Sequence, residues 1–169
     1  MRLQAMTKVV AGTVFMAALA AYAGMAADVV LKPADLTKLL PATVFYSGQT
    51  APVQERNSGG VKFSDGHYVL AALVDTSGYS SGVAAKYQGY LITEVPLTIG
   101  GQQLPAGAYG FGFLEGGRFL VTNLGGGDVL SAAATTDAAL SRPRPLAVTD
   151  DPAGGFRLYA GRAYIVFSR

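Results

Sequence analysis

A serine between two glycines is the first feature of the sequence that could carry chemistry. Residues 78–82 read GYSSG and match the pattern G-x-S-x-G. This pattern marks the nucleophile elbow of serine hydrolases, where a sharp strand-to-helix turn exposes the serine. An apolar run, Tyr68–Val74, precedes the motif, and residues 83–88, which are compatible with a helix, follow it. The motif raises the hypothesis that Ser80 is a nucleophile.

The partners of such a serine are poorly placed. In these hydrolases the acid and the histidine follow the serine, whereas the single histidine, His67, precedes Ser80. A triad with Asp75 is excluded, because His67 and Asp75 end one expected strand and lie about 26 Å apart at ~3.3 Å per residue. A pair of Ser80 and Lys86 needs no histidine and remains an alternative. The plainer interpretation is a glycine-rich loop whose serines and tyrosines bond to backbone.

Metal and carboxylate chemistry have few suitable residues. The chain has no cysteine and one histidine, which excludes the usual zinc ligand sets, cysteine nucleophiles and iron–sulfur clusters. Glu94 and Glu115, expected on strands or strand ends, are candidates for a glycosidase pair. The adjacent Asp150 and Asp151 lie in a Pro/Gly turn, where we expect solvated side chains and no calcium site. We predict no cofactor, no bound metal and no catalytic residues.

The loop at residues 75–90 is the strongest candidate for recognition. It concentrates tyrosine, serine and glycine, a composition suited to adaptable binding. If the protein binds a ligand, we expect the contacts from Tyr79, Ser80, Ser81, Tyr87 and Tyr90. The alternative is that the tyrosines pack as a lid over the open end of the fold, since aromatic side chains dominate core energetics.

The first 27 residues are typical of a secretory signal peptide. Arg2 and Lys8 precede an apolar stretch at 9–24, and small residues allow cleavage after Ala23, Ala26 or Ala27. The apolar stretch is shorter than the ~20 residues of a spanning helix. We therefore predict a signal at 1–27 and one exported domain at 28–169, periplasmic or extracellular, with no membrane span after cleavage.

The charge and the length of the chain restrict the classes of partner that we expect. Without Arg2 and Lys8 the 13 basic residues fall to 11, which equals the 11 acidic residues, so the mature charge is zero. No basic patch remains to bind nucleic acid. About 140 residues can bury a sufficient core, so an exported domain of this size folds without disulfides. The expected partner is an unknown small molecule or an envelope protein.

The pattern of short apolar runs and tight turns predicts an all-β fold. Turns are expected at Gly100-Gly101 and Gly116-Gly117, and strands at 43–46, around the turn at Asp65-Gly66, and three times after residue 145. Residues 47–60 are expected to form a loop or an irregular edge segment. Single-turn helices are expected at 35–40 and from Thr136 or Asp137 to Leu140. We predict nine or ten strands in an antiparallel sandwich or small closed barrel.

Residues 99–114 (IGGQQLPAGAYGFGFL) carry the hairpin motif L-P-A-G-x-Y. On this hairpin the chain resembles secreted bacterial β-sandwich or jelly-roll domains of unknown function. The resemblance implies a fold class and a compartment but no site residue. The function expected from the sequence is a non-catalytic exported β-domain that binds a small molecule, a glycan or a protein partner in the cell envelope. The alternatives are an exported hydrolase that uses carboxylates or the Ser80–Lys86 pair, and a structural envelope protein.

Overall fold

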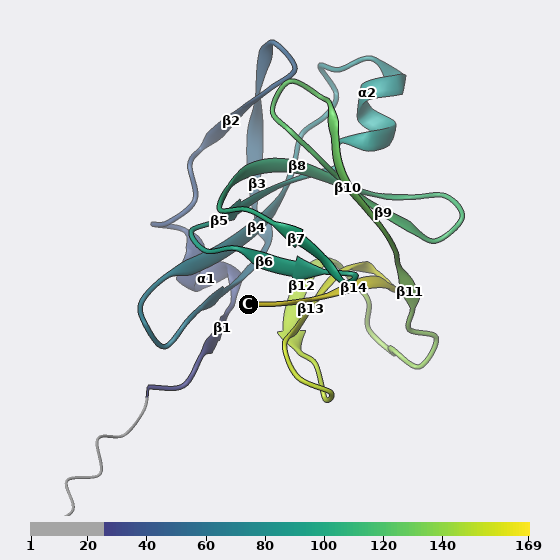
Figure 1. Ribbon diagram of the computed structural model, residues 1–169. Coiled ribbons are helices and arrows are strands. Elements are labelled where there is room, and N and C mark those ends of the chain that lie inside the picture. The colour runs from purple at the N-terminus through teal and green to yellow at the C-terminus, as the bar shows by residue number, and fades with distance from the viewer. Residues whose placement is uncertain (1–25) are drawn as a thin grey trace, which may run out of the picture.

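Two antiparallel β-sheets and two short helices make up the computed structural model, which describes residues 26–169 (Figure 1). The larger sheet has the strand order β1-β3-β4-β5-β8-β9-β10, with β2 paired to β3. The smaller sheet has the order β12-β13-β14-β6-β7, with β11 paired to β14. The predicted all-β sandwich is confirmed, with both sheets open. Most of the predicted signal peptide, residues 1–25, lies outside the described residues.

The larger sheet takes its strands from the first three quarters of the chain. They are β1 (Val29–Leu31), β2 (Thr43–Tyr46), β3 (Gln49–Lys62), β4 (Tyr68–Val74), β5 (Gly89–Thr93), β8 (Gly107–Leu114), β9 (Arg118–Thr122) and β10 (Asp128–Ala133). The strand β4 lies between β3 and β5, and its residues are almost all buried. This confirms the prediction that the apolar run at this point is a central strand.

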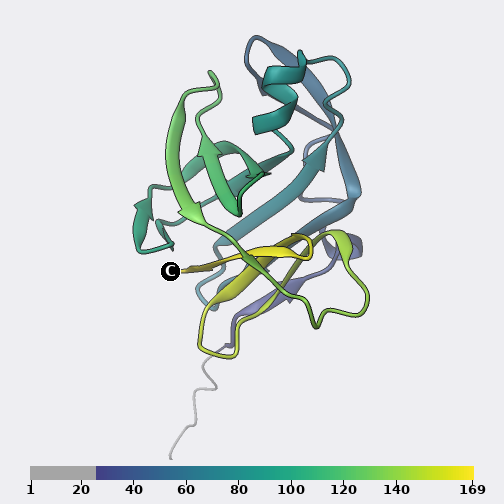
Figure 2. The same cartoon turned by 90° about the vertical axis from the view of Figure 1, so that its right-hand side faces the viewer.

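The smaller sheet combines one internal hairpin with the end of the chain. Its strands are β6 (Leu97–Ile99), β7 (Gln102–Leu104), β11 (Thr135–Thr136), β12 (Arg144–Asp150), β13 (Phe156–Gly161) and β14 (Ala163–Ser168). Figure 2 shows these C-terminal strands, in yellow, below the strands of the larger sheet. The hairpin turn between β6 and β7 has positive φ at Gly100 and Gly101, as predicted, because a primed turn needs the left-handed region there.

The main hydrophobic core lies between the two sheets. Phe111 and Phe119 from the larger sheet and Ile99, Leu158 and Phe167 from the smaller sheet belong to one buried cluster. Burial alternates along β14, where Ile165 and Phe167 are buried while their neighbours are only partly so. Burial of such side chains stabilises each by about 1.5–3 kcal/mol relative to exposure.

The sheets come into close contact where β3 passes β12. A Cβ placed on Gly59 would lie 2.9 Å from the backbone nitrogen of Val148, so only glycine allows this approach. The prediction of a loop or an irregular edge segment at 47–60 is largely wrong, because most of these residues belong to the 14-residue strand β3, which is paired on both sides. Its first half pairs with β2 and its second half with β1, and β4 pairs along both parts. Neighbouring strands supply the backbone partners that its polar sequence does not suggest.

Both helices are short, and each overlaps a segment whose sequence is compatible with a helix, at 35–40 and at 83–88. The helix α1 (Pro33–Leu36) starts earlier than the predicted turn at 35–40. The helix α2 (Ser81–Lys86) falls in the segment after GYSSG. The helix predicted up to Leu140 is wrong: Thr136 belongs to β11, and the Asp137 carboxylate accepts a hydrogen bond from the backbone N–H of Ala139 in a turn that does not propagate. Neither helix is long and apolar enough to cross a membrane.

The strand count was underestimated. The described residues form 14 strands, against the nine or ten predicted, because β1, β6, β7 and β11 have only two or three residues each. Periodicity cannot identify strands of this length, since a run of three shows no reliable alternation.

Candidate functional site

The segment from residue 75 to residue 90 folds back over one end of the larger sheet. Ser80 is the N-cap of α2, and its hydroxyl accepts a hydrogen bond from the backbone N–H of Val83 at 3.4 Å. Ser81 is the exposed first residue of the helix. GYSSG is thus followed by a helix, as an elbow would be, but the Ser80 side chain is used to cap it.

The tyrosines of this segment pack into a second core cluster. Tyr87 stacks on Tyr46 of β2 with ring centroids 3.7 Å apart, and Tyr79 lies edge-on to both rings. The Tyr79 hydroxyl donates to the backbone carbonyls of Tyr46 and Gln49 at 3.1 and 3.3 Å. Gly110 of β8 makes room, since a Cβ there would lie 2.6 Å from the Tyr46 ring. The cluster, Val44, Tyr46, Ala51, Val74 and Tyr87, closes this end of the fold.

The five residues predicted to bind a ligand therefore do not form one exposed surface. Tyr87 is 0% exposed and cannot touch a ligand in this conformation. Tyr79 and Tyr90 are partly buried against the same cluster, Ser80 caps a helix, and Ser81 faces solvent. Burial, followed by the neighbouring phenols, raises the pKa of Tyr87, and its hydroxyl has no hydrogen-bond partner among residues 26–169.

Three candidate groups of the alternative hydrolase, Ser80, Lys86 and Glu94, each have another partner. Ser80 and Lys86 lie at opposite ends of α2, about 9 Å apart along its axis at 1.5 Å per residue. The Lys86 ammonium pairs with Asp128 at 3.3 Å. Glu94 accepts a hydrogen bond from the backbone N–H of Tyr68 at 2.8 Å. Within residues 26–169, no three His, Asp or Glu side chains gather as a metal ion would require.

A groove between the two sheets gathers the residues best suited to hold a small molecule. We call it the β1–β12 groove; its cavity has a volume of about 440 Å³, within the usual range of ligand sites. One wall is β1 with the following Lys32, the floor is β12 and β13, and the other wall is the segment before β12. It is lined by Val30, Lys32, Leu140, Arg142, Arg144, Ala147, Val148, Thr149, Asp150, Tyr159 and Gly161.

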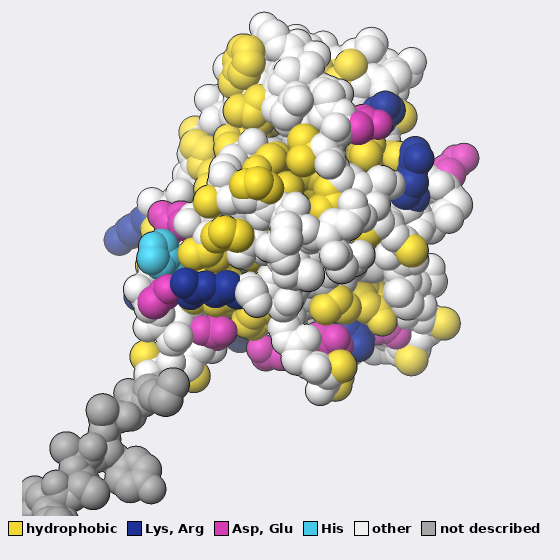
Figure 3. Space-filling view, viewed as in Figure 1, with side chains coloured by type: hydrophobic (Ala, Val, Ile, Leu, Met, Phe, Trp, Pro, Cys, Tyr) yellow, Lys and Arg dark blue, Asp and Glu magenta, His cyan; other side chains and the backbone are white. Residues whose placement is uncertain are grey.

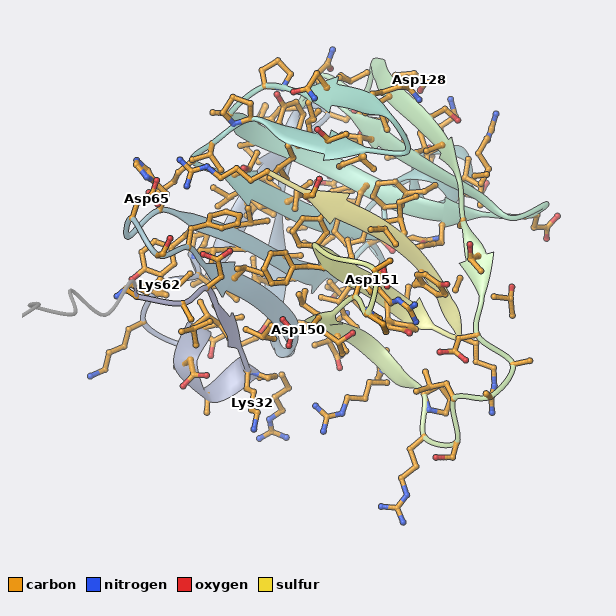
Figure 4. All side chains as sticks on the ribbon, turned by 60° about the horizontal axis from the view of Figure 1, so that its bottom comes forward. Lys32, Lys62, Asp65, Asp128, Asp150 and Asp151 are labelled. Atoms are coloured by element: carbon orange, nitrogen blue, oxygen red, sulfur yellow. The ribbon has the colours of Figure 1, made fainter. Side chains whose placement is uncertain are left out.

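The groove has a net charge of +2 (3 − 1). Its three cations are Lys32, Arg142 and Arg144, and its one carboxylate is Asp150. None of the three cations is among the ion pairs formed by residues 26–169, so no carboxylate neutralises them there. Figure 4 shows Lys32 and Asp150 on the underside of the molecule, beside β1 and at the end of β12. On the face seen in Figure 3, charged side chains lie mainly in the lower half and at the right edge.

No family model, no curated protein and no solved structure matches this chain.

Strands and short-range hydrogen bonds hold the groove in place. Ala147 pairs with Tyr159 across β12 and β13, and the neighbours of Ala147 along β12 point into the core. Lys32 is fixed where β1 meets α1, because its backbone N–H donates to the Asp35 carboxylate at 2.9 Å. Side chains built on paired strands keep their positions better than those on loops, so the floor needs little ordering when a ligand binds.

A polar network supports the floor from the outer face of the smaller sheet. The Tyr159 hydroxyl donates to Asp137 at 3.0 Å and accepts from the Arg157 guanidinium at 3.2 Å. Arg157 also pairs with Asp151 at 2.8 Å and lies over the Tyr164 ring at 4.4 Å. The hydrogen bonds with Tyr159 and then Asp151 raise the pKa of Arg157. This network fixes the ring of Tyr159, which lines the groove.

The segment that forms the far wall is also anchored. The Arg162 guanidinium donates to the backbone carbonyls of Ala138 and Leu140, and the backbone N–H of Asp137 donates to the carbonyl of Arg162. Residues 137–140 are therefore tied to Arg162, the turn residue between β13 and β14. The wall is part of the folded domain, although it contains no helix.

A second cavity beside α2 is less suitable for a ligand. It has a volume of about 500 Å³, and Lys86, Glu115 and Arg118 are its charged residues. Charges of both signs lie together there, and Lys86 is already paired with Asp128. The β1–β12 groove differs because its cations have no such partner.

Sequence reasoning missed the groove for a physical reason. Lys32 and Arg144 are separated by more than 100 positions, and only the packing of β1 beside β12 brings them to one cavity. The one local signal was residues 142–145 (RPRP), in which two arginines each precede a proline. A residue before proline favours extended backbone, but this pattern does not indicate what the arginines face.

Proposed function

We propose that this protein is an exported, non-catalytic binding domain, and that the β1–β12 groove binds a small molecule. The observation that carries the proposal is the combination of three cations without carboxylate partners and an apolar floor in one cavity of about 440 Å³. Ligand sites are typically concave, mostly apolar, and supplied with a few well-placed polar groups.

The compartment in the proposal rests on the N-terminal pattern. The basic start, the apolar stretch at 9–24 and the alanines at 21–27 support export to the periplasm or the medium. Intact-mass measurement of the protein recovered from its own cell envelope tests this directly. We expect a chain that begins at residue 24, 27 or 28; a full-length chain in the cytoplasm would contradict export.

Binding in the groove is tested by the small molecules that stay with the native protein. Wild-type protein, Ala147→Phe and Ala133→Phe are recovered from the native envelope and compared by native mass spectrometry. Ala147 is on the groove floor, and an added ring would fill the cavity. Ala133, exposed at the end of β10, lines a different cavity and is the matched control.

We expect one small molecule to remain with wild type and with Ala133→Phe and to be lost from Ala147→Phe. Thermal melts of all three variants show whether each is folded. The proposal fails if wild-type protein carries no small molecule, or if folded Ala147→Phe retains as much of it as wild type.

A further inference from the structure

We infer that the ligand of the β1–β12 groove is an anionic amphiphile with one carboxylate or phosphate head and one apolar tail. This inference rests on the proposed function and adds the chemical class of the ligand. Three features of the groove support the inference: the positive charge at one end, the apolar lining of the floor and the negative charge at the other end.

The head-binding end is built by Arg142 and Arg144. Each arginine precedes a proline, Pro143 or Pro145, and a residue before proline is confined to extended backbone. A bend at Ser141 and Arg142 precedes the start of β12 at Arg144, and both arginines line the groove. Both guanidinium groups are therefore available to one ligand in the cavity.

Two guanidinium groups in one cavity favour a particular partner. Each presents a planar set of donors that matches the oxygens of carboxylate and phosphate. Both arginines are exposed, and neither is paired with an acid of the described chain. An anionic head placed between them would lower the repulsion between the two cations as well as form charged hydrogen bonds.

The groove has a polarity along β12. Arg144 begins the strand and Asp150 ends it, six residues later, so the two lie about 20 Å apart at ~3.3 Å per residue. The Asp150 carboxylate would repel a second anionic group of the ligand at this end of the groove. The ligand therefore carries its negative charge at the arginine end only, and not at both ends as a dicarboxylate would.

The floor between the two ends accepts an apolar chain. Val30, Leu140 and Ala147, which are all partly exposed, line this part of the groove. Apolar side chains at the floor favour an apolar tail over a polar one. Tyr159 is only 6% exposed, so its ring offers no stacking platform for a glycan.

The test is isothermal titration of the purified protein with five probes, below the concentrations at which they form micelles. Decanoate and decyl phosphate carry the two candidate heads on one tail. Decyltrimethylammonium has the tail with the opposite charge. Acetate and inorganic phosphate have the heads without the tail. We expect both decyl anions to bind, the tighter one identifying the natural head, and the other three to bind at least tenfold more weakly.

The arginines are tested by a double variant, Arg142→Gln with Arg144→Gln. Loss of charged hydrogen bonds worth about 1.5–3 kcal/mol should weaken decyl anion binding by at least tenfold. Arg118→Gln, which removes an arginine beside the other cavity, is the matched control and should change the affinity less than twofold. Added salt should weaken binding to wild type more than to the double variant.

The outcomes separate the ligand class from the function. If decyltrimethylammonium binds as tightly as the anions, if the heads bind without a tail, or if the double variant matches Arg118→Gln, the amphiphile class is wrong. In that case the groove function still stands if Ala147→Phe loses the molecule that co-purifies with wild type. If no probe binds and nothing co-purifies, both proposals fail.

Discussion

Replacing Tyr87 by phenylalanine should leave the protein as stable as wild type or more stable. The Tyr87 ring is fully buried and stacked on Tyr46, yet its hydroxyl has no hydrogen-bond partner within the described part of the chain. An unsatisfied buried polar group costs about 1–3 kcal/mol. Phenylalanine keeps the ring, its stacking and its apolar contacts, and removes only the unpaired oxygen. We expect the free energy of unfolding to rise by about 1 kcal/mol.

The matched control is Tyr46→Phe in the same stacked pair. The Tyr46 hydroxyl bonds to the buried Thr122 hydroxyl at 2.9 Å. Its loss leaves Thr122 without that partner, so this variant should be less stable by about 1–3 kcal/mol. Equilibrium unfolding in urea measures both variants, with an unchanged slope showing that only stability has changed. In a domain of this size, 1 kcal/mol shifts the melting temperature by about 3–5 °C.

The two substitutions are nearly identical chemically and are expected to change stability in opposite directions. If Tyr87→Phe destabilises the protein as much as Tyr46→Phe does, the Tyr87 hydroxyl has a bonding partner. The packing described for this cluster would then be wrong. Equal and negligible effects would mean that both hydroxyls reach water.

Three further predictions concern a turn, an acid and a cap. Gly101→Val should lower the melting temperature by several degrees, because φ is +77° there and a β-branched residue is strained in that region; an unchanged melting curve would contradict the turn. Burial opposes ionisation of Asp65, but hydrogen bonds from His67 and Arg169 lower its pKa to about 2. The ionised Asp65 carboxylate therefore stabilises the folded state fully at pH values above its unfolded pKa near 3.9, and this stabilisation is lost as the pH falls toward 2. Melting temperatures across this range should fall less steeply for Asp65→Asn than for wild type, and parallel curves would refute the assignment. Ser80→Ala should reduce stability by about 0.5–1 kcal/mol through loss of the cap and leave any hydrolase activity unchanged; an inactive, folded Ser80→Ala protein would revive the nucleophile hypothesis.

The sequence predicted those parts of the fold that local chemistry determines. The turn at Gly100-Gly101 needs positive φ, and the run Tyr68–Val74 is too apolar to be anything but buried. The strand β3 could not be predicted in this way, because its polar residues are held by pairing with strands on both sides. The helix expected after Thr136 failed for the same reason, since pairing of β11 with β14 takes precedence over a local cap.

The candidate site also has parts that the local sequence predicts and parts that depend on packing between distant segments. Tyr79 and Tyr87 were predicted from composition as a surface for recognition, and composition cannot distinguish an exposed aromatic cluster from a buried one. The structure gives Tyr87 no exposure. Arg142 and Arg144 have a local signal in their prolines, but the third cation, Lys32, joins them only through the packing of the two sheets. No spacing in the sequence indicates that contact.

A crystal structure of the protein with decyl phosphate tests the central claim most directly. We predict density for one alkyl chain along β12, with the phosphate within hydrogen-bond distance of Arg142 and Arg144 and the tail over Ala147. Density at the tyrosine cluster or beside α2, with an empty β1–β12 groove, would contradict the claim.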